Sequence, residues 1–183
     1  MIDRDLVYAC VSREAEALEE AYKNRCATGF EDFVPLFNWR SESFIIRIVD
    51  EMTRLQGIRV KAKQLECFLT IAGWAVLAME NCGTCGRNVN TGHPTDFVEP
   101  RLTWGQICAI INTERQYQEE LSPDRTDGHE RGTDGYSVML SYYVHKLVEQ
   151  WTVNAGDEYA LDVMRKVAGI CVHCLEDCGV SNV

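Results

Sequence analysis

The sequence is poor in residues that interrupt helices and lacks the pattern that builds sheets. Only 4 prolines occur in 183 residues, and alternation of β-branched and polar residues is nearly absent. Long stretches instead repeat apolar residues three and four positions apart, which is the period of an amphipathic helix. The sequence therefore predicts an all-α protein with helices at residues 4–24, 42–57, 61–80, 103–121, 135–153 and 157–177.

Basic residues are also scarce. The chain has 18 lysine and arginine residues against 28 aspartate and glutamate residues, a formal net charge of −10 at pH 7. Binding to a nucleic-acid backbone requires clustered basic side chains, so this balance argues against a nucleic-acid partner. A basic pocket is still compatible with an acidic protein, because the field in a cleft is set locally.

The sequence shows neither a membrane-spanning run nor a secretory-type start. No apolar run approaches the length that crosses a bilayer, and the first residues do not combine a basic segment with an apolar stretch. The nine cysteines are an odd number spread over predicted helices, a distribution typical of reduced thiols. We therefore expect a cytoplasmic protein with no membrane partner.

Familiar motifs for nucleotides and metals are missing or incomplete. The chain has no Gly-x-x-x-x-Gly-Lys-Ser/Thr loop and no Gly-x-Gly-x-x-Gly after a strand. The segments Cys82 to Cys85 and Cys171 to Cys174 have the spacing of zinc ligands, but the second falls inside a predicted helix, where buried reduced cysteines are common. We expect no zinc site.

Two segments are predicted to be exposed loops. Residues 81–100 are rich in Gly, Asn, Thr and Pro, and residues 122–135 contain almost no apolar side chain. Both would lie on the surface, outside the helical core.

Two pairs of segments repeat in the same order. The segment AGWAVLAMENCG at residues 72–83 aligns without gaps with AGICVHCLEDCG at residues 168–179. Upstream, VSREAEALEEAY at residues 11–22 aligns with INTERQYQEELS at residues 111–122, and three glutamates coincide. The order and spacing of these matches indicate an internal duplication.

The duplication predicts the domain organisation. One three-helix unit would span residues 1–86 and the second residues 103–183, with a connecting loop at 87–102. A three-helix unit of this size has a thin core, so we expect the two units to pack together as one helical bundle.

Two of the predicted helices resemble a known family. The stretches ESFIIRIVDEMTRLQGI and LECFLTIAGWAVLAME are similar to phage-borne, nucleotide-modification-associated relatives of the all-α MazG-like pyrophosphohydrolases. Those relatives carry an Arg-x-x-Asp helix ending in Arg-Leu, then a helix with acidic residues ahead of a small–aromatic–Ala segment. The matching positions here are Arg47, Asp50, Arg54, Leu55, Glu66 and the segment Ala72 to Ala75. The second half resembles another phage family of this helical type through residues 114–118, 150–151 and 160–179.

The resemblance implies a particular chemistry. MazG-like enzymes hydrolyse a nucleoside triphosphate between its α and β phosphates, using Mg²⁺ held by Asp and Glu side chains of facing helices. The acids that would hold Mg²⁺ here are Glu16, Glu19, Glu20, Asp50 and Glu66. The chain departs from the family pattern where acids are expected, at Leu69 and, in the second half, at Ser141 and Tyr142.

A charged stripe runs along the helix predicted at residues 42–57. Arg47, Asp50 and Arg54 are three and four residues apart and share one face. The stripe is either a solvated set of ion pairs or, as the resemblance implies, a wall of a site whose arginines bind phosphate oxygens. The candidate nucleotide-binding residues are Trp39, Arg40, Arg47, Asp50 and Arg54, with Arg115, Tyr117 and Arg165 from the second half.

Three functions are compatible with these patterns. We expect a phage-type binding protein that needs no cofactor and sequesters a nucleotide or cyclic nucleotide-type immune signal in the host cytoplasm without cleaving it. The alternatives are a Mg²⁺-dependent nucleoside triphosphate pyrophosphohydrolase and an interaction protein without a small ligand. Four or more converging carboxylates would favour the enzyme, whereas arginines and aromatic rings around a cavity would favour the binding protein. The resemblance also implies a homo-oligomer.

Overall fold

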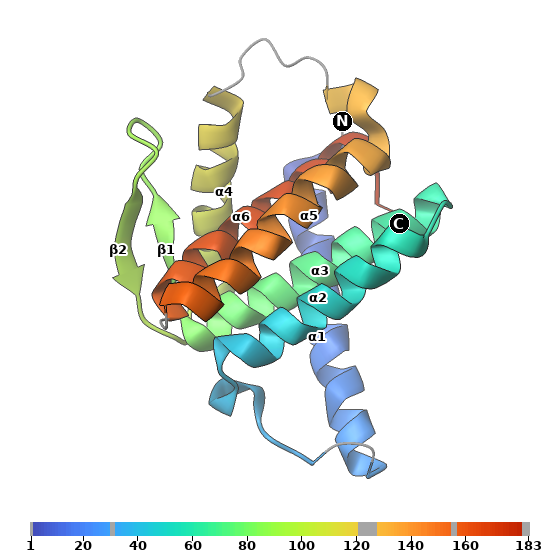
Figure 1. Ribbon diagram of the computed structural model, residues 1–183, viewed down its shortest axis with the longest axis vertical. Helices are drawn as coiled ribbons and strands as arrows, with labels where there is room; N and C mark the ends of the chain where they lie inside the picture. Colours follow the sequence, from blue (N-terminus) through green and yellow to red (C-terminus); the bar gives the residue numbers. More distant parts are fainter. Residues whose placement is uncertain (1, 30–31, 121–127, 155–156, 181–183) are drawn as a thin grey trace.

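Six α-helices make up most of the computed structural model, which describes residues 2–29, 32–120, 128–154 and 157–180 (Figure 1). The helices are α1 (Arg4–Ala27), α2 (Ser41–Gly57), α3 (Lys61–Cys82), α4 (Trp104–Glu120), α5 (Gly128–Asn154) and α6 (Asp157–Cys178). A short 3₁₀ turn, η1 (Leu36–Asn38), precedes α2, and two strands, β1 (Thr84–Arg87) and β2 (Pro94–Val98), follow α3. The predicted all-α class is confirmed.

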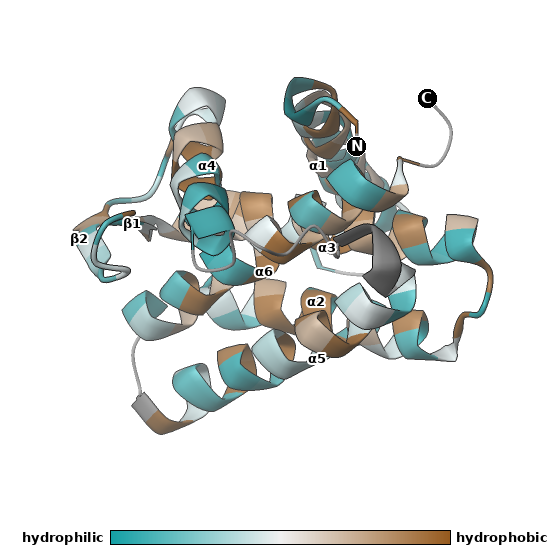
Figure 2. Ribbon diagram, turned by 90° about the horizontal axis from the view of Figure 1, so that it is seen from above, coloured by the Kyte–Doolittle hydropathy of each residue, from teal (hydrophilic) through white to brown (hydrophobic). Residues whose placement is uncertain are grey.

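Helices α3 and α6 form the centre of a layered bundle. They pack against each other, α2 packs on α3, α5 packs on α6, and α2 also contacts α5. Helix α1 contacts α3 and α4 contacts α6, on the opposite side of the central pair from α2 and α5 (Figure 2). One continuous cluster of buried apolar side chains includes residues of all six helices, so the two predicted units share a core.

The central helices approach the outer helices closely at two glycines. A Cβ added to Gly73 in α3 would lie 3.2 Å from Cγ of Glu14 in α1, and one added to Gly169 in α6 would lie 3.1 Å from Cγ of Glu114 in α4. These residues hold corresponding positions in the aligned segments. The aligned segments therefore meet in the same way within each half, as a duplication requires. The duplication and its boundaries at residues 86 and 103 stay predictions.

Helix α3 is apolar around its whole circumference over residues 71–79, which are all buried. Such a helix fits a position with neighbours on several sides, here α1, α2 and α6. By length and composition α3 would also suit a membrane span, although 67% of the relevant window is buried inside the described protein. The expectation that no apolar run approaches the length of a membrane span is therefore wrong for α3, judged by length and composition. Its burial here is that of a core helix.

The main departure from prediction follows α3. Residues 81–100 are predicted to be a loop, but β1 and β2 pair there as an antiparallel hairpin. Gly83 and Gly92, with φ of 83° and 69°, allow the chain to leave α3 and to close the hairpin turn. Contacts outside the hairpin hold it, since Oγ1 of buried Thr84 donates to the carbonyl of Leu161 in α6 (3.0 Å). Strands this short show too little alternation to be recognised in sequence.

The second predicted loop, residues 122–135, is only partly described, because residues 121–127 lie outside the described ranges. Helix α5 begins at Gly128, and non-helical backbone at Gly132 (φ 57°, ψ −176°) separates its first turn from the rest. The remainder of α5 agrees with the predicted helix at 135–153.

Candidate functional site

Four arginines and their carboxylate partners form a charged network between α1, α4, α6 and the hairpin. The members of this arginine network are Arg4, Arg87, Arg115 and Arg165, with Glu114, Glu119, Asp162 and Glu176. Most of these side chains are buried, which makes their pairing a condition for a stable fold.

Arg165 lies at one end of the arginine network. Its Nε donates to Oε2 of Glu114 (3.0 Å), its Nη2 to Oδ1 of Asp162 (2.5 Å), and its Nη1 to the carbonyls of Cys85 (2.5 Å) and Gly86 (2.6 Å). The residue is 0% exposed. Its donors are engaged inside the protein, where they neutralise Glu114 and hold β1 against α6.

Glu114 accepts hydrogen bonds from a second arginine as well. Nε of Arg87 lies 2.5 Å from Oε2 of Glu114, and the Arg87 guanidinium carbon lies 4.5 Å from the ring centroid of Tyr117. Nε2 of Gln118 donates to Oε1 of Glu114 (3.0 Å). These contacts allow a carboxylate to be buried between α4 and α6. They also place Tyr117, a predicted nucleotide-binding residue, against the hairpin.

At the other end of the arginine network, two arginines share two carboxylates. Arg115 donates through Nη2 to Oε2 of Glu176 (3.0 Å) and to Oε1 of Glu119 (3.2 Å). Arg4 pairs with Glu119 (2.6 Å) and also with Glu176. Nucleotide binding by Arg115 or Arg165 stays a prediction, and it would require breaking these buried pairs.

The two arginines of the predicted stripe on α2 contact different partners. The guanidinium carbon of Arg47 lies 5.7 Å from the ring centroid of Trp39 and 6.0 Å from that of Trp74. Arg54 pairs with Glu51 (Nη2–Oε1 3.1 Å), and 54% of its side chain is exposed. The two guanidinium groups therefore have separate surroundings along α2, and a common role in one site stays a prediction.

Trp39, the predicted base-stacking residue, packs within the protein. Its ring centroid lies 4.8 Å from that of Tyr22, 5.1 Å from that of Phe44 and 6.2 Å from that of Trp74. Its Nε1 donates to the carbonyl of Val34 (3.1 Å). These neighbours make Trp39 a support for the segment before α2. Its neighbour Arg40, also predicted to bind nucleotide, is exposed.

The predicted Mg²⁺ ligands are spread over the surface. Those that are exposed are Glu16 and Glu20 on α1, Asp50 on α2 and Glu66 on α3. Glu19 pairs with Lys23 (2.9 Å). Among the described residues, no three His, Cys, Asp or Glu side chains are grouped so that they could hold a metal ion. The predicted ligands do not fit the acid cluster of MazG-like enzymes, and we derive no step through Mg²⁺.

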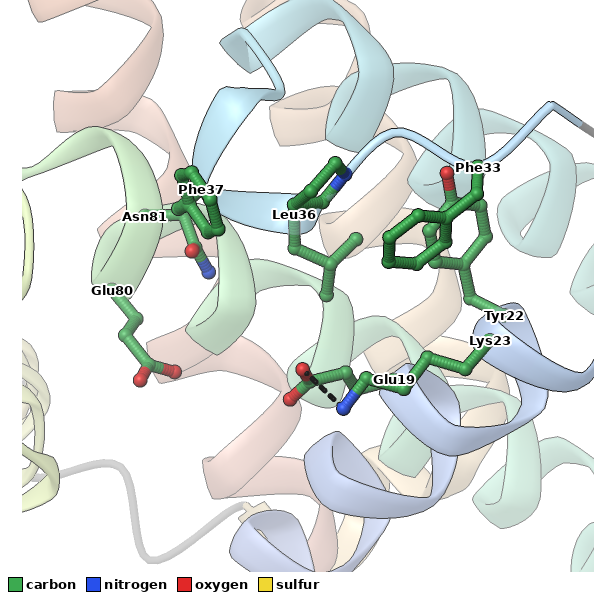
Figure 3. A pocket seen from close by; sticks show the side chains of 9 residues that line it. Glu19, Tyr22, Lys23, Phe33, Leu36, Phe37, Glu80 and Asn81 are labelled. Atoms are coloured by element: carbon green, nitrogen blue, oxygen red, sulfur yellow. Dashed lines mark ion pairs between the residues drawn. The ribbon is translucent and has the colours of Figure 1, made fainter. Parts of the chain in front are cut away.

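A cavity of about 360 Å³ opens beside Glu19 (Figure 3). It lies between the C-terminal half of α1, the segment before α2 and the C-terminal end of α3. Its lining residues are Glu19, Tyr22, Lys23, Phe33, Pro35, Leu36, Phe37, Glu80 and Asn81. We call it the aromatic pocket. Glu19 is the one candidate residue from the sequence that belongs to this lining.

The segment before α2 turns two aromatic rings outward at the aromatic pocket. Leu36 in η1 is 6% exposed and anchors the turn, while Phe33 and Phe37 are 58% and 63% exposed. Tyr22 of α1, itself 2% exposed, donates from its Oη to the carbonyl of Val34 (2.8 Å). The pocket therefore presents solvent-exposed ring faces on a packed base.

The polar side of the aromatic pocket carries two carboxylates and one ammonium group. Figure 3 shows the Glu19 and Glu80 side chains extending from α1 and α3 into the same space, with Lys23 paired to Glu19. Burial and, secondarily, the charge of Glu19 raise the pKa of Glu80. Exposed Lys–Glu pairs contribute little to stability, so a ligand can displace Lys23 from Glu19. The arrangement suits a planar ring that donates hydrogen bonds.

Sequence reasoning misses most of the aromatic pocket. The available signal is the stretch FVPLF at residues 33–37, in which two phenylalanines flank a proline outside any helical period. Glu80 has a second signal, because it lies in the repeated segment and corresponds to Glu176.

Searches with this chain against protein-family models, curated proteins and solved structures find no match. The fold and the pocket together describe an all-α bundle with an open aromatic and acidic cavity. The resemblance to MazG-like proteins stays a prediction from the sequence segments quoted above.

Proposed function

We propose that the protein binds a nucleotide or nucleotide-derived small molecule in the aromatic pocket and holds it without cleaving it. The observation that carries the proposal is the exposure of Phe33 and Phe37 beside the polar side chains of Glu19, Lys23 and Glu80. Exposed aromatic rings stack on bases of any kind, and small-molecule sites combine such rings with a few polar groups. A volume of about 360 Å³ accommodates a base with part of its sugar.

The biological role that we propose comes from the resemblance to phage proteins. The chain would sequester a nucleotide-type immune signal in the cytoplasm of the host cell, as a homo-oligomer and without a cofactor. Holding rather than cleaving the ligand is supported by the small number of carboxylates at the aromatic pocket, where the two acids Glu19 and Glu80 share the space with Lys23.

The second candidate function is a Mg²⁺-dependent nucleoside triphosphate pyrophosphohydrolase. One observation favours it: Glu19 and Glu80 extend from two neighbouring helices into one cavity, as acids of MazG-like enzymes do (Figure 3). Two carboxylates are fewer than that chemistry uses, so binding without cleavage is the better supported function.

A sequestration-and-release assay tests the proposal. The protein is incubated with Mg²⁺ and a panel of nucleotides, cyclic dinucleotides and cyclic ADP-ribose isomers, and is then filtered off and heat-denatured. We expect one compound to be depleted from the filtrate and recovered intact from the denatured protein. Phe37→Ala should abolish the depletion, whereas Tyr142→Ala, which removes a similarly exposed ring from α5, should not.

Two other outcomes decide against the proposal. A nucleoside monophosphate and pyrophosphate in the filtrate would establish the hydrolase instead. No depletion of any compound would leave an interaction protein as the remaining function.

A further inference from the structure

In the second half of the chain, the glutamates that correspond to Glu19 and Glu80 are paired with arginines. In the arginine network, Glu119 of α4 and Glu176 of α6 together hold the guanidinium groups of Arg4 and Arg115. Arg115 contributes a fork of N–H donors to this pair, with Nη2 3.0 Å from Glu176 Oε2 and 3.2 Å from Glu119 Oε1. Two carboxylates on crossing helices are thus neutralised by a planar group with several N–H donors.

The corresponding carboxylates of the first half are Glu19 of α1 and Glu80 of α3. The aligned segments pair Glu19 with Glu119 and Glu80 with Glu176. The helix crossings support this pairing, since Gly73 meets α1 where Gly169 meets α4. The two pairs of glutamates therefore hold corresponding positions on corresponding helix pairs, although Glu176 is 2% exposed and Glu80 is exposed.

The first half lacks the arginine that would fill this place. The residue that corresponds to Arg115 is Ala15, which is buried. Instead of a guanidinium group, the first half has the cavity of about 360 Å³ next to Glu19 and Glu80 (Figure 3). A ligand that replaces the missing group must be planar and must donate several neighbouring N–H bonds.

We propose, on the basis of the proposed function, that the aromatic pocket selects a guanine nucleotide. The N1–H and 2-amino groups of guanine form a guanidine-like fork of donors on one edge of a planar ring. Glu80, with Glu19 beside it, accepts this fork, and the rings of Phe33 and Phe37 stack on the base. The base displaces Lys23 from Glu19, which leaves Lys23 as the cation of the pocket for a phosphate.

The other common bases do not offer this pattern. Adenine presents an amino group beside a ring nitrogen that accepts, and uracil presents one N–H between two carbonyl oxygens. Hypoxanthine keeps N1–H but lacks the 2-amino group, so it differs from guanine in one donor. Adenine and uracil place an acceptor against a carboxylate oxygen, and hypoxanthine leaves one carboxylate oxygen without a donor, so these bases should bind more weakly.

Equilibrium dialysis of the full chain with GMP, IMP and AMP tests the inference. We expect GMP to bind roughly tenfold more tightly than IMP or AMP, because one charge-assisted hydrogen bond is at stake. Glu80→Gln should weaken the binding of GMP more than that of IMP and bring the two affinities to within about threefold, because GMP loses an acceptor whereas IMP loses only the charge on the acceptor of N1–H. Glu149→Gln, which changes an exposed glutamate of α5 outside the pocket, is the matched control.

The outcomes separate this inference from the proposed function. Equal affinity for GMP and IMP, or tighter binding of AMP, would overturn guanine selection. If the affinity for these nucleotides still depended on Phe37, the nucleotide-binding proposal would stand. A GMP preference that survives Glu80→Gln in a folded variant would also overturn it. If none of the nucleotides binds and the sequestration assay depletes nothing, both proposals fail.

Discussion

Arg165 of α6 donates to Glu114 of α4 through Nε and Oε2 at 3.0 Å, and the two residues are 0% and 2% exposed. The same carboxylate accepts from Arg87 of the hairpin. One buried charge therefore connects three separate segments of the chain. Removal of one partner leaves the other charge in the core without full compensation, and such changes are strongly destabilising.

Arg165→Met should lower the free energy of unfolding by about 3–5 kcal/mol, because it leaves Asp162 and Glu114 short of a buried partner. Urea denaturation followed by circular dichroism measures the loss. Arg54→Met removes a guanidinium group that is 54% exposed from Glu51, which is 12% exposed, and should cost less than Arg165→Met. Similar losses for the two variants would show that the network around Glu114 adds no special stability.

Gly169→Ala should destabilise the protein by about 1–3 kcal/mol. The added Cβ would lie 3.1 Å from Cγ of Glu114, whose carboxylate is fixed by two arginines and cannot move aside. Gly73→Ala should cost less, because its tightest contact is the flexible end of Leu18. Gly57→Ala meets nothing within 4 Å and should be neutral or stabilising by up to about 1 kcal/mol. Thermal unfolding of the three variants gives the order, and a gain for Gly169→Ala would contradict the close crossing.

Cys178 should be the first cysteine to react with iodoacetamide near neutral pH. A hydrogen bond from Cys174, opposed by burial and aided by Lys61, lowers the pKa of Cys178 to about 7. Burial instead raises the pKa of Cys67 and Cys108 to about 11. Peptide mass spectrometry across pH 6–9 should show that the labelling rate of Cys178 reaches half of its maximum near the pKa of the thiol. Uniform labelling of all three thiols would count against this assignment.

The lowered pKa of Cys178 also makes the free energy of unfolding depend on pH. In the folded protein the thiol loses its proton at lower pH than in the unfolded chain, whose pKa is near 9.0. The stabilisation is fully present above pH 9 and is lost as the pH falls towards 7. Cys178→Ser should remove this contribution, so the difference in unfolding free energy between wild type and variant should shrink from pH 9 to pH 6.

Glu80→Gln should stabilise the ligand-free protein at pH 7. Burial and the charge of Glu19 raise the pKa of Glu80, so its ionised form is less favourable in the folded state than in the unfolded chain. A raised pKa contributes stability below the unfolded pKa and loses it as the pH rises through the folded pKa. Melting curves should therefore show a gain at pH 7 that disappears near pH 4. A loss at pH 7 would mean that the carboxylate has a structural partner.

The positions of the helices are largely predictable from the sequence. The apolar period places α3 at 61–80 and α6 at 157–177, against observed bounds of Lys61–Cys82 and Asp157–Cys178. The helical period is set by residues three and four positions apart. It can therefore be recognised in the sequence without knowledge of the tertiary structure. The hairpin is different, because the contact of Thr84 with Leu161 that holds it is not local in sequence.

The site is less predictable for the same reason. The partners of Arg115 and Arg165 lie 61 and 51 residues away in sequence, at Glu176 and Glu114, so the pattern along one helix does not show that these arginines are paired. The aromatic pocket draws on three elements, and its exposed rings lie in an aperiodic segment. The repeat is the one sequence pattern that relates distant helices to each other, and Gly73 and Gly169, which it aligns, both lie close to a neighbouring helix.

The central position of α6 has a consequence for synthesis of the protein on the ribosome. Helix α6 emerges after α1, α3, α4 and α5, yet it packs against all four of them. Until residues 157–178 leave the exit tunnel, the apolar surface of α3 that they cover remains open to other chains. We therefore expect the nascent chain to bind a chaperone at this stage, and the fold to close only after translation of α6 is complete.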